Sequence, residues 1–251
     1  MTSYYEQSGI VIYHGDCREL MPHLTAVDHV ITDPPYEAEA HTLARRVCTG
    51  KSSDRYPKGI AEERPLDFEP MRAADRVAVG RLMASLCDGW VLVFCQVEAA
   101  MLWREALVPA RYIRTQIWRK PDGAPQFTGD RPGMGYESIV TCWAGAERPE
   151  WNGGGRHGVY EYMTVKRGAH HQTEKPEALM CELVHLFTQP DDLILDPYGG
   201  SGTTAVAAKR LGRRCILIEQ QESYCEIAAR RLTQEVLPLL TVEPVPSEKM
   251  F

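Results

Sequence analysis

Residues 191–204 read DDLILDPYGGSGTT, and this stretch decides the fold. The apolar run LILD predicts a buried strand, the glycines predict a tight turn, and TTAVAAKRL (203–211) predicts the helix that follows. A helix that begins in such a turn presents free backbone N–H groups, which favour a carboxylate or a phosphate. The glycines allow a ligand to approach the backbone closely. The stretch therefore predicts an α/β unit with a ligand site at the carboxyl end of its strand.

The same alternation of strands and helices continues through the chain. Strands are expected at 11–16, 28–33, 90–95, 111–118, 137–143, 192–196 and 214–219, and further helices at 71–87, 177–188 and 223–237. The expected apolar stripes are Met71, Ala74, Ala78, Leu82 and Leu86; Leu179, Leu183 and Leu186; and Tyr224, Ile227, Ala228 and Leu232. This pattern predicts a single α/β domain over residues 1–251 with a seven-stranded, mostly parallel sheet.

Composition is that of a soluble globular protein, with 44% apolar and 25% charged residues in a chain of 251. We expect a cytoplasmic protein, because the N-terminus has no signal-peptide pattern and no apolar run approaches the ~20 residues of a membrane helix. The eight cysteines show no zinc spacing, so we expect reduced packing thiols and no metal site. The net charge of −6 argues mildly against a nucleic-acid partner, although local patches matter more than the sum.

Glu219 ends the strand that follows the glycine turn, at a distance suited to binding ribose hydroxyls. Two ligands compete for such a site. Residues 200–205 fit the dinucleotide pattern G-x-G-x-x-A, which favours a nicotinamide cofactor. Asp196, at the mouth of the turn, would sit poorly beside a pyrophosphate and suits a ligand with an amino-acid moiety.

A second motif, ITDPPYE, occupies residues 31–37. The prolines end the preceding strand, because neither can donate to a ladder, and Pro34 holds Asp33 extended. A carboxylate and an aromatic ring, Asp33 and Tyr36, are thereby fixed at a strand end. The plainer interpretation is a strand stop followed by a turn.

With ITDPPY ahead of DPYGGSGTT, the chain resembles the amino-methylating DNA methyltransferases that use S-adenosylmethionine. The order of the motifs is that of the permuted β-class, and HGDCREL (14–20), YESIV (136–140), HQTEKP (171–176) and LIE (217–219) extend the resemblance over most of the chain. The resemblance implies the seven-stranded Rossmann-like methyltransferase fold with helices on both faces, S-adenosylmethionine as cofactor and double-stranded DNA as substrate. A role in restriction–modification, phage defence or regulation is left open.

The resemblance also implies the residues of the cofactor site. Glu219 would hold the ribose, Asp16 the adenine, and the segment before the 177–188 helix the methionine end. For Lys175 alone, a solvated lysine ahead of Pro176 is the plainer interpretation. The full expected set is Asp16, Cys17, Asp33, His171, Thr173, Lys175, Asp196, Pro197, Tyr198, Gly199, Gly200, Ser201, Gly202, Thr203, Glu219 and Gln220.

The catalytic set is expected to be Asp33, Pro34, Pro35 and Tyr36. The exocyclic amino nitrogen of adenine is a poor nucleophile, so a carboxylate and a backbone carbonyl, those of Asp33 and Pro34, would accept its N–H bonds. Tyr36 would stack on the flipped base. Cytosine-C5 methylation needs a cysteine nucleophile, usually in a Pro-Cys step, and the chain contains no such step. Aspartate in the first position of the tetrapeptide favours adenine N6 over cytosine N4.

DNA contacts are expected from two insertions, a mobile active-site loop at 38–66 and a short target-recognition region at 144–170. Both are expected on the working edge of the sheet, which is the edge that carries the active site. Residues 111–167 carry nine Lys/Arg against six Asp/Glu, a net +3. So short a region implies a short recognition sequence, or help from a second subunit in a homodimer. The candidate DNA contacts are Arg45, Arg46, Lys51, Arg131, Arg156, Lys166 and Arg167.

Other functions remain open at this point. They are an RNA adenine methyltransferase, a cytosine-N4 enzyme, an NAD(P)-dependent oxidoreductase and a DNA-binding module with a decayed site. A protein-glutamine methyltransferase fits less well, because its cofactor motif precedes the X-P-P-Y tetrapeptide.

Overall fold

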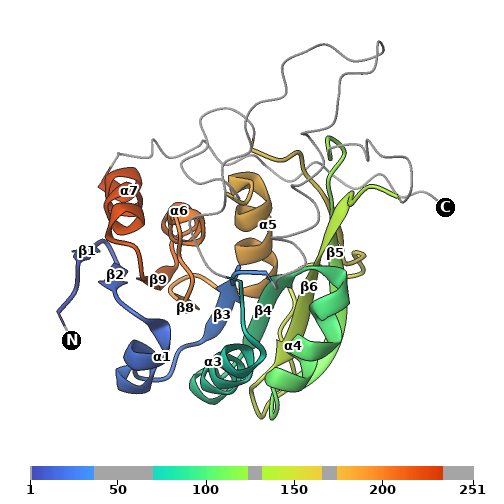
Figure 1. Ribbon diagram of the computed structural model, residues 1–251, viewed down its shortest axis with the longest axis horizontal. Coiled ribbons are helices and arrows are strands. Elements are labelled where there is room, and N and C mark those ends of the chain that lie inside the picture. The colour runs from blue at the N-terminus through green and yellow to red at the C-terminus, as the bar shows by residue number, and fades with distance from the viewer. Residues whose placement is uncertain (1, 37–69, 124–131, 166–173, 234–251) are drawn as a thin grey trace.

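The computed structural model describes residues 2–36, 70–123, 132–165 and 174–233. They build a nine-stranded sheet in the order β1-β2-β9-β8-β3-β4-β6-β5-β7 (Figure 1). All seven expected strands are present, and the two that the sequence analysis missed, β1 and β7, are three-residue strands at the sheet edges. The strands are β1 (Tyr5–Gln7), β2 (Ile10–His14), β3 (His29–Thr32), β4 (Trp90–Cys95), β5 (Arg111–Arg119), β6 (Tyr136–Trp143), β7 (Val159–Glu161), β8 (Leu193–Asp196) and β9 (Arg214–Glu219).

Strand direction decides which residues meet at one edge of the sheet. The neighbours β2, β9, β8, β3 and β4 are parallel, as the alternation of strands and helices predicts. Only β1 and β6 run against their neighbours in the described sheet, and β6 lies between β4 and β5. Because β6 is antiparallel, its first residues lie where β4 and β5 end, at the same edge as the motifs that follow β3 and β8.

Helices cover both faces of the sheet, as expected. Figure 1 shows α5, α6 and α7 on one face and α1, α3 and α4 on the other. Within β4, Leu92 and Phe94 pack toward the first layer and Val91 and Val93 toward the second. The helices are α1 (Cys17–Leu20), α3 (Ala73–Leu86), α4 (Ala100–Ala106), α5 (Glu177–Phe187), α6 (Thr203–Arg210) and α7 (Glu222–Thr233), with 3-10 turns η1 (Met21–His23) and η3 (Val97–Ala99).

The helix α3 is present, but its expected stripe is only partly right: Met71 is buried, and the partly buried Leu82 and Leu86 pack against the core. Ala74 and Ala78 are exposed, and the buried positions are Arg76, Val79, Gly80, Met83 and Ala84. The reason is close packing on α4: a Cβ on Gly80 would lie 2.7 Å from the carbonyl oxygen of Ala106. A search for large apolar residues passes over a glycine and an arginine, and so it missed part of the buried face. The stripes expected for α5 and α7 are confirmed, with Ile227 only partly buried.

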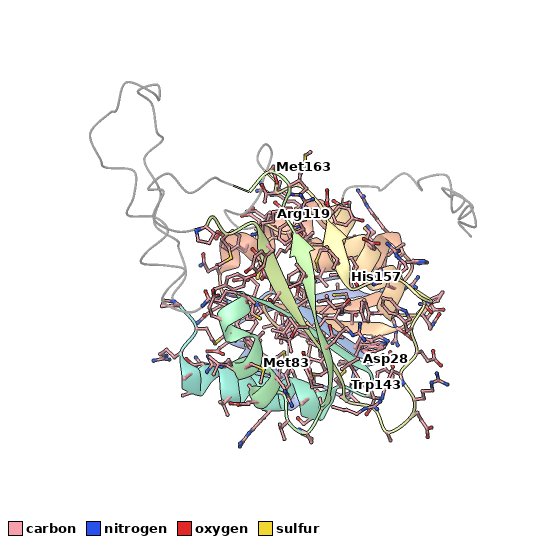
Figure 2. The ribbon with its side chains drawn as sticks, turned by 90° about the vertical axis from the view of Figure 1, so that its right-hand side faces the viewer. Asp28, Met83, Arg119, Trp143, His157 and Met163 are labelled. Atoms are coloured by element: carbon pink, nitrogen blue, oxygen red, sulfur yellow. The ribbon has the colours of Figure 1, made fainter. Side chains whose placement is uncertain are left out.

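Residues 144–152 do not lie on the working edge, where the sequence analysis placed them. Glu150 accepts a hydrogen bond at its carbonyl from Trp90 Nε1 (2.5 Å), and Asn152 Nδ2 donates to the carbonyl of His185 (2.9 Å), both at the opposite end of the sheet. Figure 2 shows the path from Trp143 at one end, past His157, to Met163 at the end where Arg119 lies. Of the expected target-recognition region, the described part at the working edge is therefore β7 and the residues that follow it.

Among the described helices, none combines the length and the apolar character needed to cross a membrane. Seven of the cysteines fall in the described residues; all seven are free thiols and only Cys181 is not fully buried. They pack as the sequence analysis expects.

Candidate functional site

The carboxyl ends of β2, β3, β8 and β9 meet around a cavity of about 710 Å³. It joins the two motifs, because both the DPPY segment and the glycine turn line it. Its walls include most of the expected site: Asp16, Cys17, Asp33, Pro34, Pro35, Tyr36, Lys175, Asp196, Pro197, Tyr198, Gly199, Gly200, Ser201, Thr203, Glu219 and Gln220. The volume is that of an ordinary small-ligand site.

The glycine turn is held open by backbone geometry and by Glu219. Gly200 has a φ of +50°, which suits glycine, and a Cβ there would meet nothing within 4 Å. The Glu219 carboxylate accepts hydrogen bonds from the N–H groups of Gly200 and Gln221, both at 2.8 Å. These bonds fix a carboxylate at the end of β9, next to the turn.

Gly202, by contrast, is not among the residues that line the cavity, contrary to the expected cofactor set. It is buried with a φ of +84°, and a Cβ there would lie 2.8 Å from Cβ of Ala228 on α7. Its part is to let α6 start against α7. Gly199 lines the cavity and also touches the core, since a Cβ there would lie 2.1 Å from Cγ of Leu217.

Asp196 is buried at the base of the turn, with both carboxylate oxygens already bonded to the protein. Oδ1 accepts from Thr32 Oγ1 (2.7 Å) and Tyr198 N (3.1 Å), and Oδ2 accepts from Thr204 Oγ1 (2.6 Å). Burial raises the pKa of Asp196 to about 6, against the effect of these hydrogen bonds. Asp196 thus ties β3, the turn and α6 together.

Asp16 caps α1 on the other side of the cavity. Its Oδ1 accepts from Arg18 N (2.8 Å) and Arg18 Nε (3.0 Å), while Arg18 Nη1 pairs with Asp75 at 2.6 Å. The hydrogen bond from Arg18 lowers the pKa of Asp16, so this carboxylate is ionised at neutral pH. Gly15 N donates to the carbonyl of Glu219 (2.9 Å), which places Asp16 beside the end of β9.

Asp33 and Tyr36 belong to a cluster of charged side chains that the sequence motifs did not reveal. Lys175 Nζ donates to Asp33 Oδ2 and lies 3.3 Å from Glu137 Oε2. Tyr36 donates its hydroxyl to Glu137 Oε2 at 2.6 Å, and Lys120 Nζ donates to Glu137 Oε1. The side chain of Lys175 is only 7% exposed, so the solvated lysine of the plainer interpretation is excluded.

The charged groups of this cluster shift one another's pKa values. Burial and the nearby Glu137 raise the pKa of Asp33, and Lys175 opposes that rise. Burial alone would raise the pKa of Glu137, but the ammonium groups of Lys175 and Lys120 bring it below its usual value. Burial likewise tends to lower the pKa of Lys175, yet the carboxylates of Asp33 and Glu137 leave it raised. Lys175 is therefore a buried cation between two carboxylates.

Sequence reasoning gave no role to Glu137, Lys120 or Arg231. Arg231 on α7 donates from Nη1 to the carbonyl of Ser201 (2.8 Å) and pairs with Glu174 Oε1 (2.9 Å), so it links the glycine turn to the segment before α5. One signal was available for Glu137: it is a carboxylate at the head of a buried strand. Glu137 lies at the working edge because β6 is antiparallel, and the sequence does not predict that direction.

Several expected residues lie outside the described ranges: His171 and Thr173 of the cofactor set, and Arg45, Arg46, Lys51, Arg131, Lys166 and Arg167 of the DNA set. Arg156 is described, and its side chain is 57% exposed and paired with Glu182 of α5. In the described ranges, no three His, Cys, Asp or Glu side chains come together in a way that could hold a metal ion.

A family model described as a DNA methylase matches residues 151–230. The Type II methyltransferase M.HinfI of Haemophilus influenzae is 24% identical to 90% of this chain, and the match covers 69% of that protein. The Type II methyltransferase M.XycI of Xanthomonas campestris pv. cyanopsidis is 32% identical over 48% of this chain and 44% of its own length.

Two solved structures share the fold. The M1.HpyAVI–SAM complex superposes with a TM-score of 0.65 at 22% identity, covering 89% of this chain and 99% of that chain. The cytosine-N4-specific PvuII DNA methyltransferase gives a TM-score of 0.69 at 16% identity, covering 94% and 90%.

Proposed function

We propose that the chain is an S-adenosylmethionine-dependent DNA amino-methyltransferase, which its similarity to the DNA methylase model and to M.HinfI and M.XycI supports, and that it methylates the exocyclic N6 of adenine at a specific site in double-stranded DNA, with the target base flipped out of the duplex. The observation that carries the proposal is the shared cavity of the two motifs. Asp33 and Tyr36 line the same cavity as the glycine turn and Glu219.

The residues present fit S-adenosylmethionine. A ribose requires paired acceptors, which the fixed carboxylate of Glu219 supplies. An α-ammonium group requires a nearby anion, and Asp196 lies buried at the base of the turn. Asp16, next to the end of β9, would accept a hydrogen bond from the amino group of the cofactor's adenine while it keeps its bonds to Arg18. When bound, the cofactor supplies a methyl group that its sulfonium already activates.

The chain's own contribution is to hold the target nitrogen and to localise its lone pair. Asp33 and the carbonyl of Pro34 would accept the two N–H bonds of the amino group. Among the described residues, Asp33 Oδ1 is buried without a hydrogen-bond partner, which costs ~1–3 kcal/mol unless a donor arrives. The amino group of the target base is such a donor, and Asp33 would take up the proton that the nitrogen loses.

Expression in a methylation-free bacterial host, followed by modification-sensitive sequencing, tests the proposal directly. It reports the base, the modified atom and the recognition sequence together. We expect N6-methyladenine in one short motif. Methylation of cytosine N4 in place of adenine would contradict the adenine assignment, and an unmodified genome together with inert DNA in vitro would contradict the DNA substrate.

Tyr36 should act through its ring. The alanine variant should lose the stacking energy between ring and base, ~1–3 kcal/mol, and should therefore bind the flipped base poorly. The phenylalanine variant should keep much of the activity, and its smaller loss should reflect the missing hydrogen bond to Glu137. The measurement is 2-aminopurine fluorescence at the target position, with methyl transfer measured in parallel. An alanine variant that flips the base as the wild type does would contradict the stacking role.

DNA affinity should fall steeply with salt, because basic side chains release counterions from phosphates. Neutralising Arg45, Arg46 and Lys51 together should reduce the slope of log affinity against log salt by about 2.7, at ~0.9 for each lost phosphate contact. Filter binding at several salt concentrations measures the slope, and cofactor affinity should stay unchanged. A slope equal to that of the wild type would remove these three residues from the DNA interface.

A further inference from the structure

We propose that Lys175 and Glu137 are positioning residues for the methyl-transfer reaction: Lys175 holds Asp33 as an ionised acceptor for the target amino group, and Glu137 anchors both Lys175 and Tyr36. The proposal rests on the function proposed above. It also departs from the resemblance, which implies that Lys175 lines the methionine end of the cofactor.

The first step is the position of the Lys175 ammonium group. Nζ bonds Asp33 and lies 5.4 Å from the centre of the Tyr36 ring and 5.2 Å from that of Phe94. Aromatic faces attract a desolvated cation, so the two rings and the carboxylate together fix one place for it. That place is next to the DPPY segment, because Asp33 and Tyr36 belong to it.

The second step is the arrangement of Glu137. This single carboxylate accepts from Tyr36 through Oε2 and from Lys120 through Oε1, and Oε2 also lies 3.3 Å from Lys175 Nζ. It comes from β6, in the body of the sheet, and its side chain is 13% exposed. The loop that carries Asp33 and Tyr36 is thereby fastened to a strand, which orients the ring and the carboxylate relative to each other.

The third step is chemical. A carboxyl group must be ionised to take up a proton, and it accepts an N–H bond more strongly when it is ionised, yet burial favours its neutral form. Burial and Glu137 do raise the pKa of Asp33, and Lys175 is the nearby charge that acts against them. The titratable and charged groups that interact with Asp33 are Tyr36, Cys95, Lys120, Glu137, Lys175 and Asp196. Of these, Lys175 and Lys120 are the cations, and only Lys175 bonds Asp33 among the described residues.

Opposite pH shifts test the proposal. Lys175→Met removes the cation beside Asp33, so the acid limb of the rate profile should move to higher pH. Methyl transfer at neutral pH should fall about a hundredfold. Glu137→Gln removes a like charge, so the acid limb should move to lower pH, while the plateau rate falls because Tyr36 and Lys175 lose their anchor. Lys175→Arg should restore part of the rate and place the acid limb close to that of the wild type.

Lys209→Met is the matched control, because Lys209 is a partly buried lysine of α6 that bonds the carbonyl of Leu232 and lies outside the cavity. It should leave the rate profile unchanged. Cofactor affinity of Lys175→Met, measured by calorimetry, should stay within about threefold of the wild type. An unshifted acid limb in Lys175→Met, or a loss of cofactor affinity with an unshifted limb, would overturn the proposal. If Lys175→Met does not fold, the direction in which the acid limb of Glu137→Gln moves decides the test.

A second readout needs neither DNA nor cofactor. Carbon-13 NMR of aspartate-labelled protein, with the Asp33 signal assigned by the Asp33→Asn variant, should show a higher Asp33 pKa in Lys175→Met and a lower one in Glu137→Gln. Equal values in all three proteins would contradict the proposal. A wild type that methylates cytosine N4, or no DNA at all, would contradict the proposed function alone, since the titration of Asp33 is measured without a substrate.

Discussion

Asp33→Ala should abolish methyl transfer and leave cofactor binding close to that of the wild type. The substitution removes the side chain that would accept an N–H bond of the target amino group and take up its proton. General base catalysis of this kind contributes about 10²–10⁴-fold, and the loss of orientation adds to it. The cofactor contacts proposed for Glu219 and Asp196 come from β9 and β8, and not from the segment that carries Asp33.

The measurement is transfer of labelled methyl to DNA in a single turnover, together with calorimetric titration of S-adenosylmethionine. Asp33→Asn should also be severely impaired, because an amide oxygen is a weaker acceptor and the amide NH2 group can oppose the adenine N–H. It also leaves Lys175 without its carboxylate partner. Methylation by Asp33→Ala at nearly the wild-type rate would show that ITDPPYE is only a strand stop.

A pH dependence follows from the position of Asp33. Its pKa in the folded protein is raised, chiefly by burial, and the reaction requires the ionised form. The rate should therefore fall as the pH drops through that raised pKa, at a higher pH than for an exposed aspartate. An acid limb that persisted unchanged in Asp33→Asn would belong to another group.

The parts of the site that could be predicted from sequence are those encoded locally. The prolines after Thr32 end β3 whatever surrounds them, and the glycine turn between β8 and α6 needs positive φ at Gly200 and Gly202. Each motif therefore revealed its own backbone conformation. Their common cavity followed from the general rule that parallel strands end at one edge.

What the sequence left out depends on pairing between distant segments. Glu137 reaches the cavity because β6 is antiparallel, and Lys175 turns toward Asp33 because two carboxylates and two rings surround its ammonium group. The buried face of α3 is set by the contact of Gly80 with α4, where the informative residue has no side chain. The assignment of residues 144–152 to the working edge failed for a related reason. The indole N–H groups of Trp90 and Trp143 donate hydrogen bonds to backbone carbonyl groups of that segment. Such bonds cannot be predicted from the segment's own side-chain pattern.

Glu219→Ala should give the opposite phenotype to Asp33→Ala: weak cofactor binding, with a methyl-transfer rate that recovers at high cofactor concentration. The loss of charge-assisted bonds to the ribose corresponds to ~1.5–3 kcal/mol, about 10–150-fold in the dissociation constant. The structure adds a second contribution. The carboxylate also accepts from the N–H groups of Gly200 and Gln221, so its removal releases the turn on which the methionine part of the cofactor would rest.

Glu219→Gln separates these two contributions, because the amide keeps one acceptor oxygen for the turn and loses the charge. Its dissociation constant for S-adenosylmethionine should lie between those of the wild type and Glu219→Ala. Glu226→Ala is the control, because Glu226 is an exposed residue of α7 paired only with Arg230 among the described ion pairs, and its affinity should be that of the wild type. Calorimetry and thermal unfolding measure affinity and fold together. Wild-type affinity in Glu219→Ala would remove Glu219 from the ribose site. Since Asp33→Ala is expected to bind the cofactor without transferring its methyl group, the two variants together determine whether the single cavity is divided into a cofactor half at the ends of β8 and β9 and a target-base half at the end of β3.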